Sequence, residues 1–205
     1  MERPRILVVY GTRHGQCAKI AKHLAEYLNN RGCLVDVRWG KNLTMECPIT
    51  HYDGVVVGAS VYNGRHQDYI VEFVRAHRPF LREMPTGFFS VSGAAGDTDG
   101  EGMRTAEGLL GDFERRTGWR AGIARCFAGS IPYTQYGPVV RQIMKWIVGR
   151  NRGDTDTTRD FEYTDWERVE DFAESYFEAL GVEIAPAPSP EEREEIHRRG
   201  RRRAG

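Results

Sequence analysis

Short apolar runs alternate with helical periodicities along most of the chain. Apolar residues recur every three or four positions after Gln16, Gln67, Met103 and Asp165, which predicts four helices that each bury one face. Strands that read as continuous apolar runs and alternate with helices are typical of a parallel sheet covered on both faces. The pattern therefore predicts a doubly wound α/β domain, with a five-stranded parallel sheet in a three-layer α/β/α arrangement. The predicted strands are Ile6–Tyr10, Cys33–Arg38, Gly54–Ala59, Gly87–Val91 and Ile123–Ala128.

Composition narrows the class of protein. The chain has 205 residues, enough for one well-packed domain. Lys plus Arg and Asp plus Glu each number 29, so the net charge favours no nucleic-acid partner. The apolar run at the amino end is too short for a signal peptide, and no stretch is long enough to span a membrane. The four cysteines are far apart and have no histidine at metal-ligand spacing, so we expect reduced thiols, no metal site and a cytoplasmic protein.

Three loops that follow predicted strands are rich in small and polar residues. Ligands of parallel sheets bind at the carboxyl ends of the strands, and the amino end of a helix attracts phosphate. Neither G-x-G-x-x-G nor the P-loop motif occurs, and no acidic residue ends the first or third strand. With Tyr62 as a flat surface, the loops fit flavin mononucleotide (FMN), which has one phosphate and one planar ring. The candidate cofactor-binding residues are Thr12, Arg13, His14, Gly15, Gln16 and Cys17 in the first loop, Ser60, Val61, Tyr62, Asn63 and Gly64 in the second, and Ser92, Gly93, Ala94, Ala95 and Gly96 in the third.

Four motifs resemble the flavodoxin-type, quinone-dependent protoporphyrinogen oxidases of bacterial haem synthesis. They are T-R-H-G-Q (12–16), V-V-V-G-A-S (55–60), E-F-V-R-A-H (72–77) and G-D-T-D-T-T-R-D-F-E-Y-T-D-W (153–166). The T-D-T and Y-T-D-W pieces of the last motif are missing from plain flavodoxins. The resemblance implies a flavodoxin-like, FMN-binding domain over residues 1–183, with an additional segment at 131–164 between the fifth strand and the last helix. Residues 184–205 lie outside the resemblance, and their prolines and charges predict a disordered tail.

The resemblance also implies an activity. FMN would take a hydride from protoporphyrinogen IX and pass two electrons to a membrane quinone of the menaquinone type, and three such rounds would give protoporphyrin IX. His66 is a candidate for proton transfer. The additional segment carries a helical stripe and the candidate substrate-contacting or membrane-contacting residues Arg141, Lys145 and Trp146, although a stripe that faces the core explains the same pattern.

Three positions depart from the family pattern. The loop at 92–101 is acidic where the family is usually basic, Asn63 stands where an aromatic residue usually precedes the glycine, and Cys17 replaces a threonine. We expect Cys17 to act as a small donor to the phosphate beside backbone N–H groups.

Two other functions stay open. One is a one-electron carrier of the flavodoxin kind, which the balanced charge and the additional segment disfavour. The other is a flavin-dependent NAD(P)H:quinone reductase, for which no nicotinamide-binding signature is visible.

Overall fold

The computed structural model describes residues 3–43, 47–96, 100–131 and 161–181. Five parallel strands form the central sheet in the order β2-β1-β3-β5-β6, which confirms the predicted topology. The order reverses between β1 and β3, and such a point places a ligand at the carboxyl ends of the strands. The strands are β1 (Arg5–Gly11), β2 (Leu34–Trp39), β3 (Gly54–Tyr62), β5 (Thr86–Ser92) and β6 (Ile123–Ala128).

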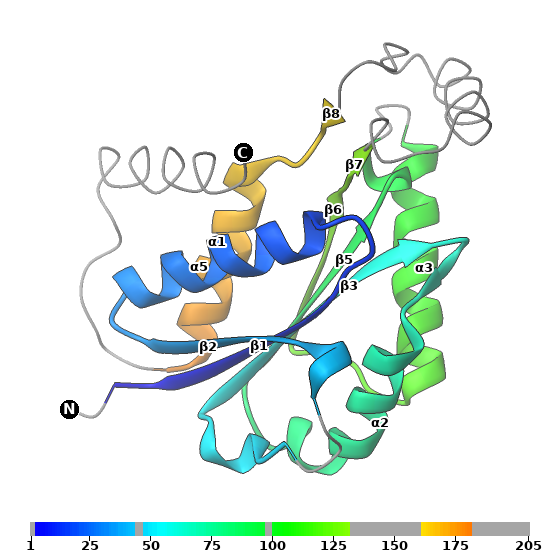
Figure 1. The fold of residues 1–205 in the computed structure, drawn as a ribbon. Coiled ribbons are helices and arrows are strands. Elements are labelled where there is room, and N and C mark those ends of the chain that lie inside the picture. Colours follow the sequence, from blue (N-terminus) through cyan, green and yellow to red (C-terminus); the bar gives the residue numbers. More distant parts are fainter. Residues whose placement is uncertain (1–2, 44–46, 97–99, 132–160, 182–205) are drawn as a thin grey trace.

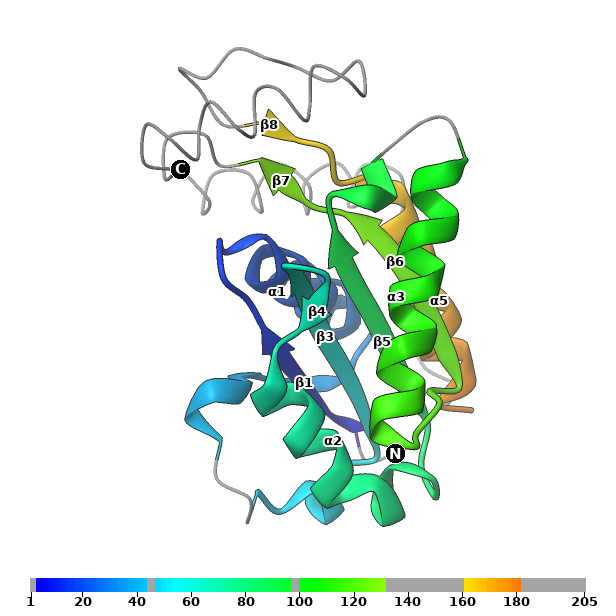
Figure 2. The same cartoon turned by 90° about the vertical axis from the view of Figure 1, so that its right-hand side faces the viewer.

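Helices cover both faces of the sheet, as predicted (Figures 1 and 2). Helices α1 (Gln16–Asn30) and α5 (Trp166–Ala179) lie on one face, and α2 (Asp68–Leu81) and α3 (Glu101–Thr117) on the other. Each helix begins within two residues of its predicted start. The sequence alternation of β1 sends Ile6 and Val8 to the first face, and Leu7 and Val9 to the second.

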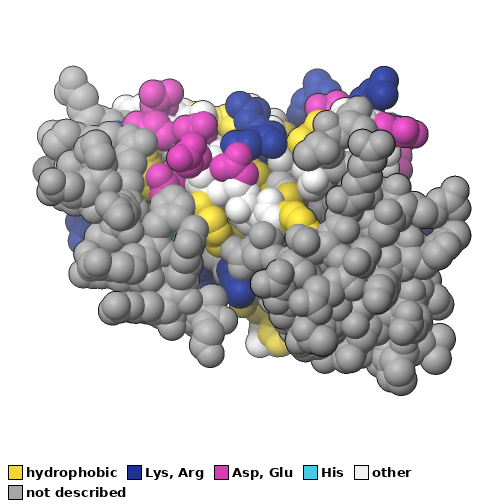
Figure 3. Space-filling model, turned by 90° about the horizontal axis from the view of Figure 1, so that it is seen from above, with side chains coloured by type: hydrophobic (Ala, Val, Ile, Leu, Met, Phe, Trp, Pro, Cys, Tyr) yellow, Lys and Arg dark blue, Asp and Glu magenta, His cyan; other side chains and the backbone are white. Residues whose placement is uncertain are grey.

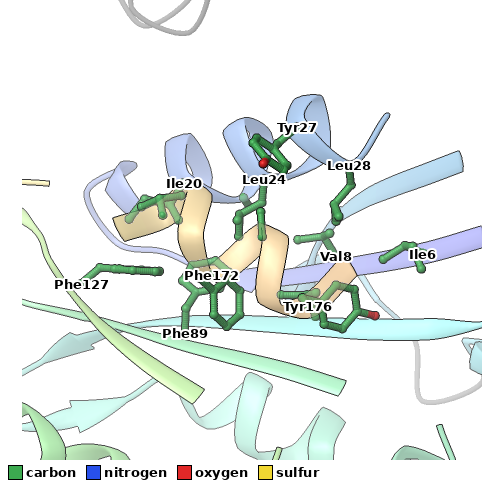
Figure 4. Close-up of a cluster of buried hydrophobic side chains, with 14 of the residues drawn as sticks. Ile6, Val8, Ile20, Leu24, Tyr27, Leu28, Phe89, Phe127, Phe172 and Tyr176 are labelled. Atoms are coloured by element: carbon green, nitrogen blue, oxygen red, sulfur yellow. The ribbon is translucent and has the colours of Figure 1, made fainter. Parts of the chain in front are cut away.

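The core beneath α1 and α5 shows how the helical stripe is used (Figure 4). Leu24 and Leu28 from α1 pack with Phe172 and Tyr176 from α5 over Val8 of β1, and all five are buried. Each such side chain contributes about 1.5–3 kcal/mol through the apolar surface it removes from water. This packing fixes the position of α1, and therefore of its amino end at the carboxyl edge of the sheet.

A polar seam also joins α1 to α5. The His23 imidazole lies 3.1 Å from the Glu170 carboxylate, and both side chains are buried. One turn further on, the Glu174 carboxylate accepts hydrogen bonds from Tyr27 at 3.0 Å and from Arg31 at 2.7 Å. Because α5 begins directly after the additional segment, the seam holds the end of that segment against the first helix.

Several short elements were not predicted. The third strand extends to Tyr62 and turns into β4 (Arg65–His66), which pairs antiparallel with it. Strands β7 (Ser130–Ile131) and β8 (Phe161–Glu162) pair with each other where the additional segment leaves and rejoins the domain. The described residues also form the 3-10 helices η1 (Gly40–Asn42), η2 (Ile49–His51) and η3 (Ala94–Gly96).

Some sequence expectations fall outside the described residues. These are the contacts assigned to Arg141, Lys145 and Trp146, and the tail at 184–205. Among the described residues, no helix combines the length and the apolar character needed to cross a membrane.

Candidate functional site

The loop between β1 and α1 leads into the amino end of helix α1, and this helix end carries no acidic side chain. Gly15 caps α1 in the left-handed conformation at φ 88°, and the Thr12 hydroxyl accepts a hydrogen bond from its N–H at 2.9 Å. The first turn of α1 has neither a side-chain cap nor an acidic residue. The first turns of the other described α-helices contain Asp68, Glu101 or Glu167. The free N–H groups and the helix dipole at this end therefore favour an anion.

Open space adjoins each of the three loops. A Cβ atom added to Gly15, Gly64 or Gly93 would meet no atom within 4 Å. These glycines follow β1, β3 and β5, whose carboxyl ends lie at the same edge of the sheet. By contrast, a Cβ atom on Gly11 would come within 2.6 Å of Ile70, so that glycine serves close packing. The loop glycines thus leave room for a ligand.

The second loop is a two-residue β-hairpin. Asn63 and Gly64 have φ values of 49° and 72°, the pair of left-handed residues that a tight turn of this kind requires. The hairpin presents Tyr62, a residue that is 41% exposed. The Arg13 guanidinium carbon lies 3.9 Å from the centre of the Tyr62 ring, and the His14 ring lies 6.1 Å away. The first two loops are therefore in contact through these side chains.

Two residues of the second loop belong to the strand rather than to a free loop. The Ser60 hydroxyl accepts a hydrogen bond from the Gln67 amide at 2.6 Å, at the start of α2. Val61 is paired with His66 across the hairpin. Both residues help to position Tyr62, and neither side chain is as exposed as that ring.

The third loop is held by its own hydrogen bonds. The Ser92 hydroxyl accepts from the Ala95 N–H at 3.3 Å, and the Gly96 N–H donates to the Gly93 carbonyl at 3.0 Å. Ala95 is buried, whereas Gly93 is exposed. A planar ligand at this loop would therefore meet backbone around Gly93 rather than a side chain.

Thr164, which the sequence analysis did not assign to the site, connects the end of the additional segment to the first loop. Its hydroxyl donates to the Ala128 carbonyl at 2.8 Å and accepts from the Gln16 side-chain amide at 2.7 Å. Because a carbonyl can only accept, the threonine proton is committed and the Gln16 nitrogen must face Thr164. The Gln16 side-chain oxygen is then buried without a hydrogen-bond partner among the described residues. The Y-T-D-W motif was the sequence signal for this contact.

The structure corrects the role of Cys17. Its side chain is fully buried in the core beneath α1, and this burial raises the pKa of the thiol well above its usual range. The thiol therefore cannot donate to a bound phosphate. Only the backbone N–H of Cys17 can contribute to the loop.

His66 also differs from its expected role. Its ring nitrogen lies 2.8 Å from the Ser90 hydroxyl, and its ring packs 5.1 Å from that of Phe113. Burial, followed by the charge of Arg116, lowers the pKa of His66 to about 4. With 3% of its surface exposed, His66 is a neutral structural group that a substrate cannot reach, so its candidacy for proton transfer is wrong.

The fold and the loops are those of a flavodoxin-like protein, and comparisons with known proteins agree with this class. Residues 7–158 match the family model described as flavodoxin domain, so the chain belongs to that family. Solved structures of the same fold include flavodoxin 1 of Bacillus cereus, with a TM-score of 0.52 at 14% identity over 85% of this chain and 97% of that one. Another is rubredoxin oxygen:oxidoreductase of Desulfovibrio gigas, with a TM-score of 0.54 at 17% identity over 87% of this chain and 37% of that one.

Two relatives carry names that are more specific than that of the family. The chain is homologous to a protoporphyrinogen IX dehydrogenase [quinone] of Escherichia coli strain K12, with 33% identity over 82% of this chain and 92% of that protein. It is 30% identical to a protein of the same name from Leishmania major, over 91% of this chain and 80% of that one.

A flavin suits the site. The family implies a flavin, and the uncharged helix end fits a terminal phosphate. The buried Gln16 side-chain oxygen lacks a donor among the described residues, and a ligand with hydroxyl groups would supply one. The glycine-lined space and the exposed Tyr62 ring fit a planar group.

Proposed function

We propose that the protein is an FMN-dependent oxidoreductase that converts protoporphyrinogen IX to protoporphyrin IX with a quinone of the menaquinone type as acceptor. The observation that carries the proposal is the 33% identity to a protoporphyrinogen IX dehydrogenase [quinone] along 92% of that protein's length. The site supports it, because one helix end is kept free of acidic groups and three glycine-rich loops leave space beside it. Domain residues 1–183 would form the enzyme, and 184–205 a tail.

In this proposal the chain holds the cofactor mainly through backbone groups. The N–H groups of residues 12–17 and the Thr12 hydroxyl would bind the phosphate at the amino end of α1. The Tyr62 hairpin would bound the ring on one side, and the exposed backbone at Gly93 on the other. When bound, FMN would supply the redox chemistry by taking up two electrons from the tetrapyrrole and releasing them to the quinone.

The buried side chains around the loops would support this arrangement without reacting. Thr164 fixes the Gln16 amide, and Gln67 fixes Ser60 at the base of the hairpin. The substrate and the quinone place the reaction at the cytoplasmic side of a membrane in this proposal. Arg141, Lys145 and Trp146 remain the proposed membrane or substrate contacts.

Anaerobic mixing tests the proposal. FMN-loaded protein is mixed with protoporphyrinogen IX, and the flavin absorbance is followed before and after addition of menadione. We expect the flavin to bleach, porphyrin fluorescence to appear, and the quinone to restore the oxidised flavin. If protoporphyrinogen leaves the flavin oxidised, the proposal is wrong. In that case, reduction by NADPH would indicate a quinone reductase, and exchange of single electrons with a reductase would indicate a carrier.

A further inference from the structure

Two arginines are neighbours of Tyr62, the exposed aromatic residue of the second loop. The Arg13 guanidinium lies over the Tyr62 ring at 3.9 Å, and Arg65 is the direct cross-strand partner of Tyr62 in the β3–β4 hairpin. Side chains of directly paired residues project from the same face of a hairpin, with Cβ atoms about 5 Å apart. Arg13, Tyr62 and Arg65 are all exposed. The three residues therefore form one surface, which we call the Tyr62 clamp.

The two arginines of the Tyr62 clamp are not paired with carboxylates in the described part of the domain. Neither Arg13 nor Arg65 forms an ion pair with a carboxylate elsewhere in the described residues, whereas Arg31, Arg115, Arg116 and Arg120 all do. The Arg13 guanidinium instead lies over the ring of Tyr62. Two cations beside an aromatic ring are thus available to an apolar ligand that carries carboxylates.

The opposite side of the site has the wrong charge for such a ligand. The third loop leads into α3, whose first residue is the acidic Glu101. Seen from above, acidic and basic side chains lie next to one another on the described part of this face, with hydrophobic and uncharged surface beside them (Figure 3). Carboxylates of a ligand would be repelled near α3 and attracted near the hairpin.

We propose that Arg13 and Arg65 bind the propionate carboxylates of the tetrapyrrole while Tyr62 supports its apolar ring, so that the clamp determines substrate specificity. This inference rests on the proposed function. A protoporphyrinogen molecule is a large apolar macrocycle with two carboxylates, which matches an exposed tyrosine with two neighbouring arginines. Arginine suits this task because its planar fork binds a carboxylate with two hydrogen bonds.

The test compares the diacid substrate with its neutral dimethyl ester. Arg65→Gln, Arg13→Gln and the double variant are loaded with FMN and assayed with protoporphyrinogen IX and menadione. We expect KM for the diacid to rise about fivefold for each single variant and about 25-fold for the double variant, the scale of exposed ion pairs. KM for the dimethyl ester stays unchanged across the variants, and kcat for the diacid changes little. High salt raises KM of the wild type but not of the double variant.

The control is Arg5→Gln at the opposite edge of the sheet. Arg5 begins β1 and also lies over a tyrosine, with its guanidinium carbon 5.5 Å from the centre of the Tyr52 ring. The substitution removes the same charge from a similar arginine–tyrosine pair. We expect KM for both substrates to match the wild type.

Each other outcome has a definite meaning. An unchanged KM for the diacid in the double variant, with the wild type active, overturns the clamp. A weaker FMN affinity of Arg13→Gln, measured by quenching of FMN fluorescence, assigns that cation to the phosphate and also overturns it. If the wild type does not oxidise protoporphyrinogen, the proposed function fails, and the clamp is then read from titrations with fluorescent protoporphyrin IX. If the wild type and the double variant bind protoporphyrin IX with equal affinity in those titrations, the clamp is overturned independently of the proposed function.

Discussion

At the scale of single residues, the side chains buried beneath the loops support them, and the exposed ones are those that we propose to meet the ligand. Cys17 illustrates the support, because its thiol joins the apolar core while its N–H stays at the helix end. His66 is a second case, since its ring bridges the hairpin to the Ser90 hydroxyl beneath α3. Tyr62 is the exposed counterpart of these buried residues, and the Arg13 guanidinium lies over its ring.

The buried His66 predicts a pH dependence of stability. Its pKa is about 4 in the folded protein and near 6.5 in an unfolded chain, so the unfolded state binds the proton more tightly. The stabilisation is complete above pH 6.5 and is lost as the pH falls towards 4. One pKa unit is worth about 1.4 kcal/mol, so the loss amounts to about 3 kcal/mol. Urea unfolding of wild type and His66→Gln at pH 7 and pH 4.5 measures it.

The variant is the control in this experiment. Glutamine keeps a hydrogen-bonding group near Ser90 but does not titrate, so the difference in unfolding free energy between the two proteins should shrink at the lower pH. A difference that is the same at both pH values would contradict the assignment of a neutral, buried His66.

The burial of Cys17 could be predicted from the sequence, but the burial of His66 could not. Cys17 begins the stripe that continues through Ile20 and Leu24, and all three are buried. The periodicity was therefore a better guide to the thiol than its place in the loop. The burial of His66 depends on packing against Phe113, which is distant in the sequence, and no local pattern reports it.

At the scale of elements, the anchor of the additional segment is Thr164. Thr164 lies just before α5, and its hydroxyl contacts Gln16 at the start of α1 and Ala128 at the end of β6. It therefore joins three elements. The sequence singled out the motif around this threonine but could not show its partners. Those contacts span 148 and 36 residues of the chain. The β3–β4 hairpin was within reach of the sequence, since Asn-Gly is a strong signal for a two-residue turn.

Replacement of Thr164 tests this anchor. Thr164→Val keeps the shape but removes the hydroxyl, which leaves the Gln16 amide and the Ala128 carbonyl without their partner. We expect a loss of about 1–3 kcal/mol in the free energy of unfolding, the cost of unsatisfied buried groups. FMN affinity should also fall, because Gln16 is the first residue of α1.

Thr164→Ser is the matched variant, since it keeps the hydroxyl and loses only a methyl group. Denaturant unfolding and FMN fluorescence quenching should place it near the wild type. Equal losses in the serine and valine variants would show that the methyl group, not the hydrogen bonds, holds the segment.

At the scale of the whole molecule, the topology gathers three loops that are distant in the sequence into one candidate site. Parallel pairing of β1, β3 and β5 brings their carboxyl ends to one edge, and this could be predicted from the alternation of strands and helices. The contact of Arg13 with Tyr62 could not be predicted, because it depends on the direction of a hairpin that lies far from Arg13 in the sequence. A ligand that touches all three loops should stabilise the domain as a unit.

This linkage gives the last prediction. FMN at 100 times its Kd should stabilise the fold by about 2.7 kcal/mol, which raises Tm by about 5–10 °C in a domain of this size. Riboflavin lacks the phosphate, so it should raise Tm much less at the same concentration. Gly15→Ala should suppress the effect of FMN, because its methyl group enters the open space at the first turn of α1.

The matched variant is Gly181→Ala, at the carboxyl end of α5. Gly181 also has a positive φ, 66° against 88° for Gly15, and its added methyl group likewise meets no atom within 4 Å. Both variants therefore carry backbone strain of about 1 kcal/mol without a steric clash in the free protein. Differential scanning calorimetry should show a lower Tm for both, but a full FMN increment only for Gly181→Ala. An intact increment in Gly15→Ala would mean that the phosphate does not bind at the amino end of α1, and the site would have to be sought elsewhere along the sheet edge.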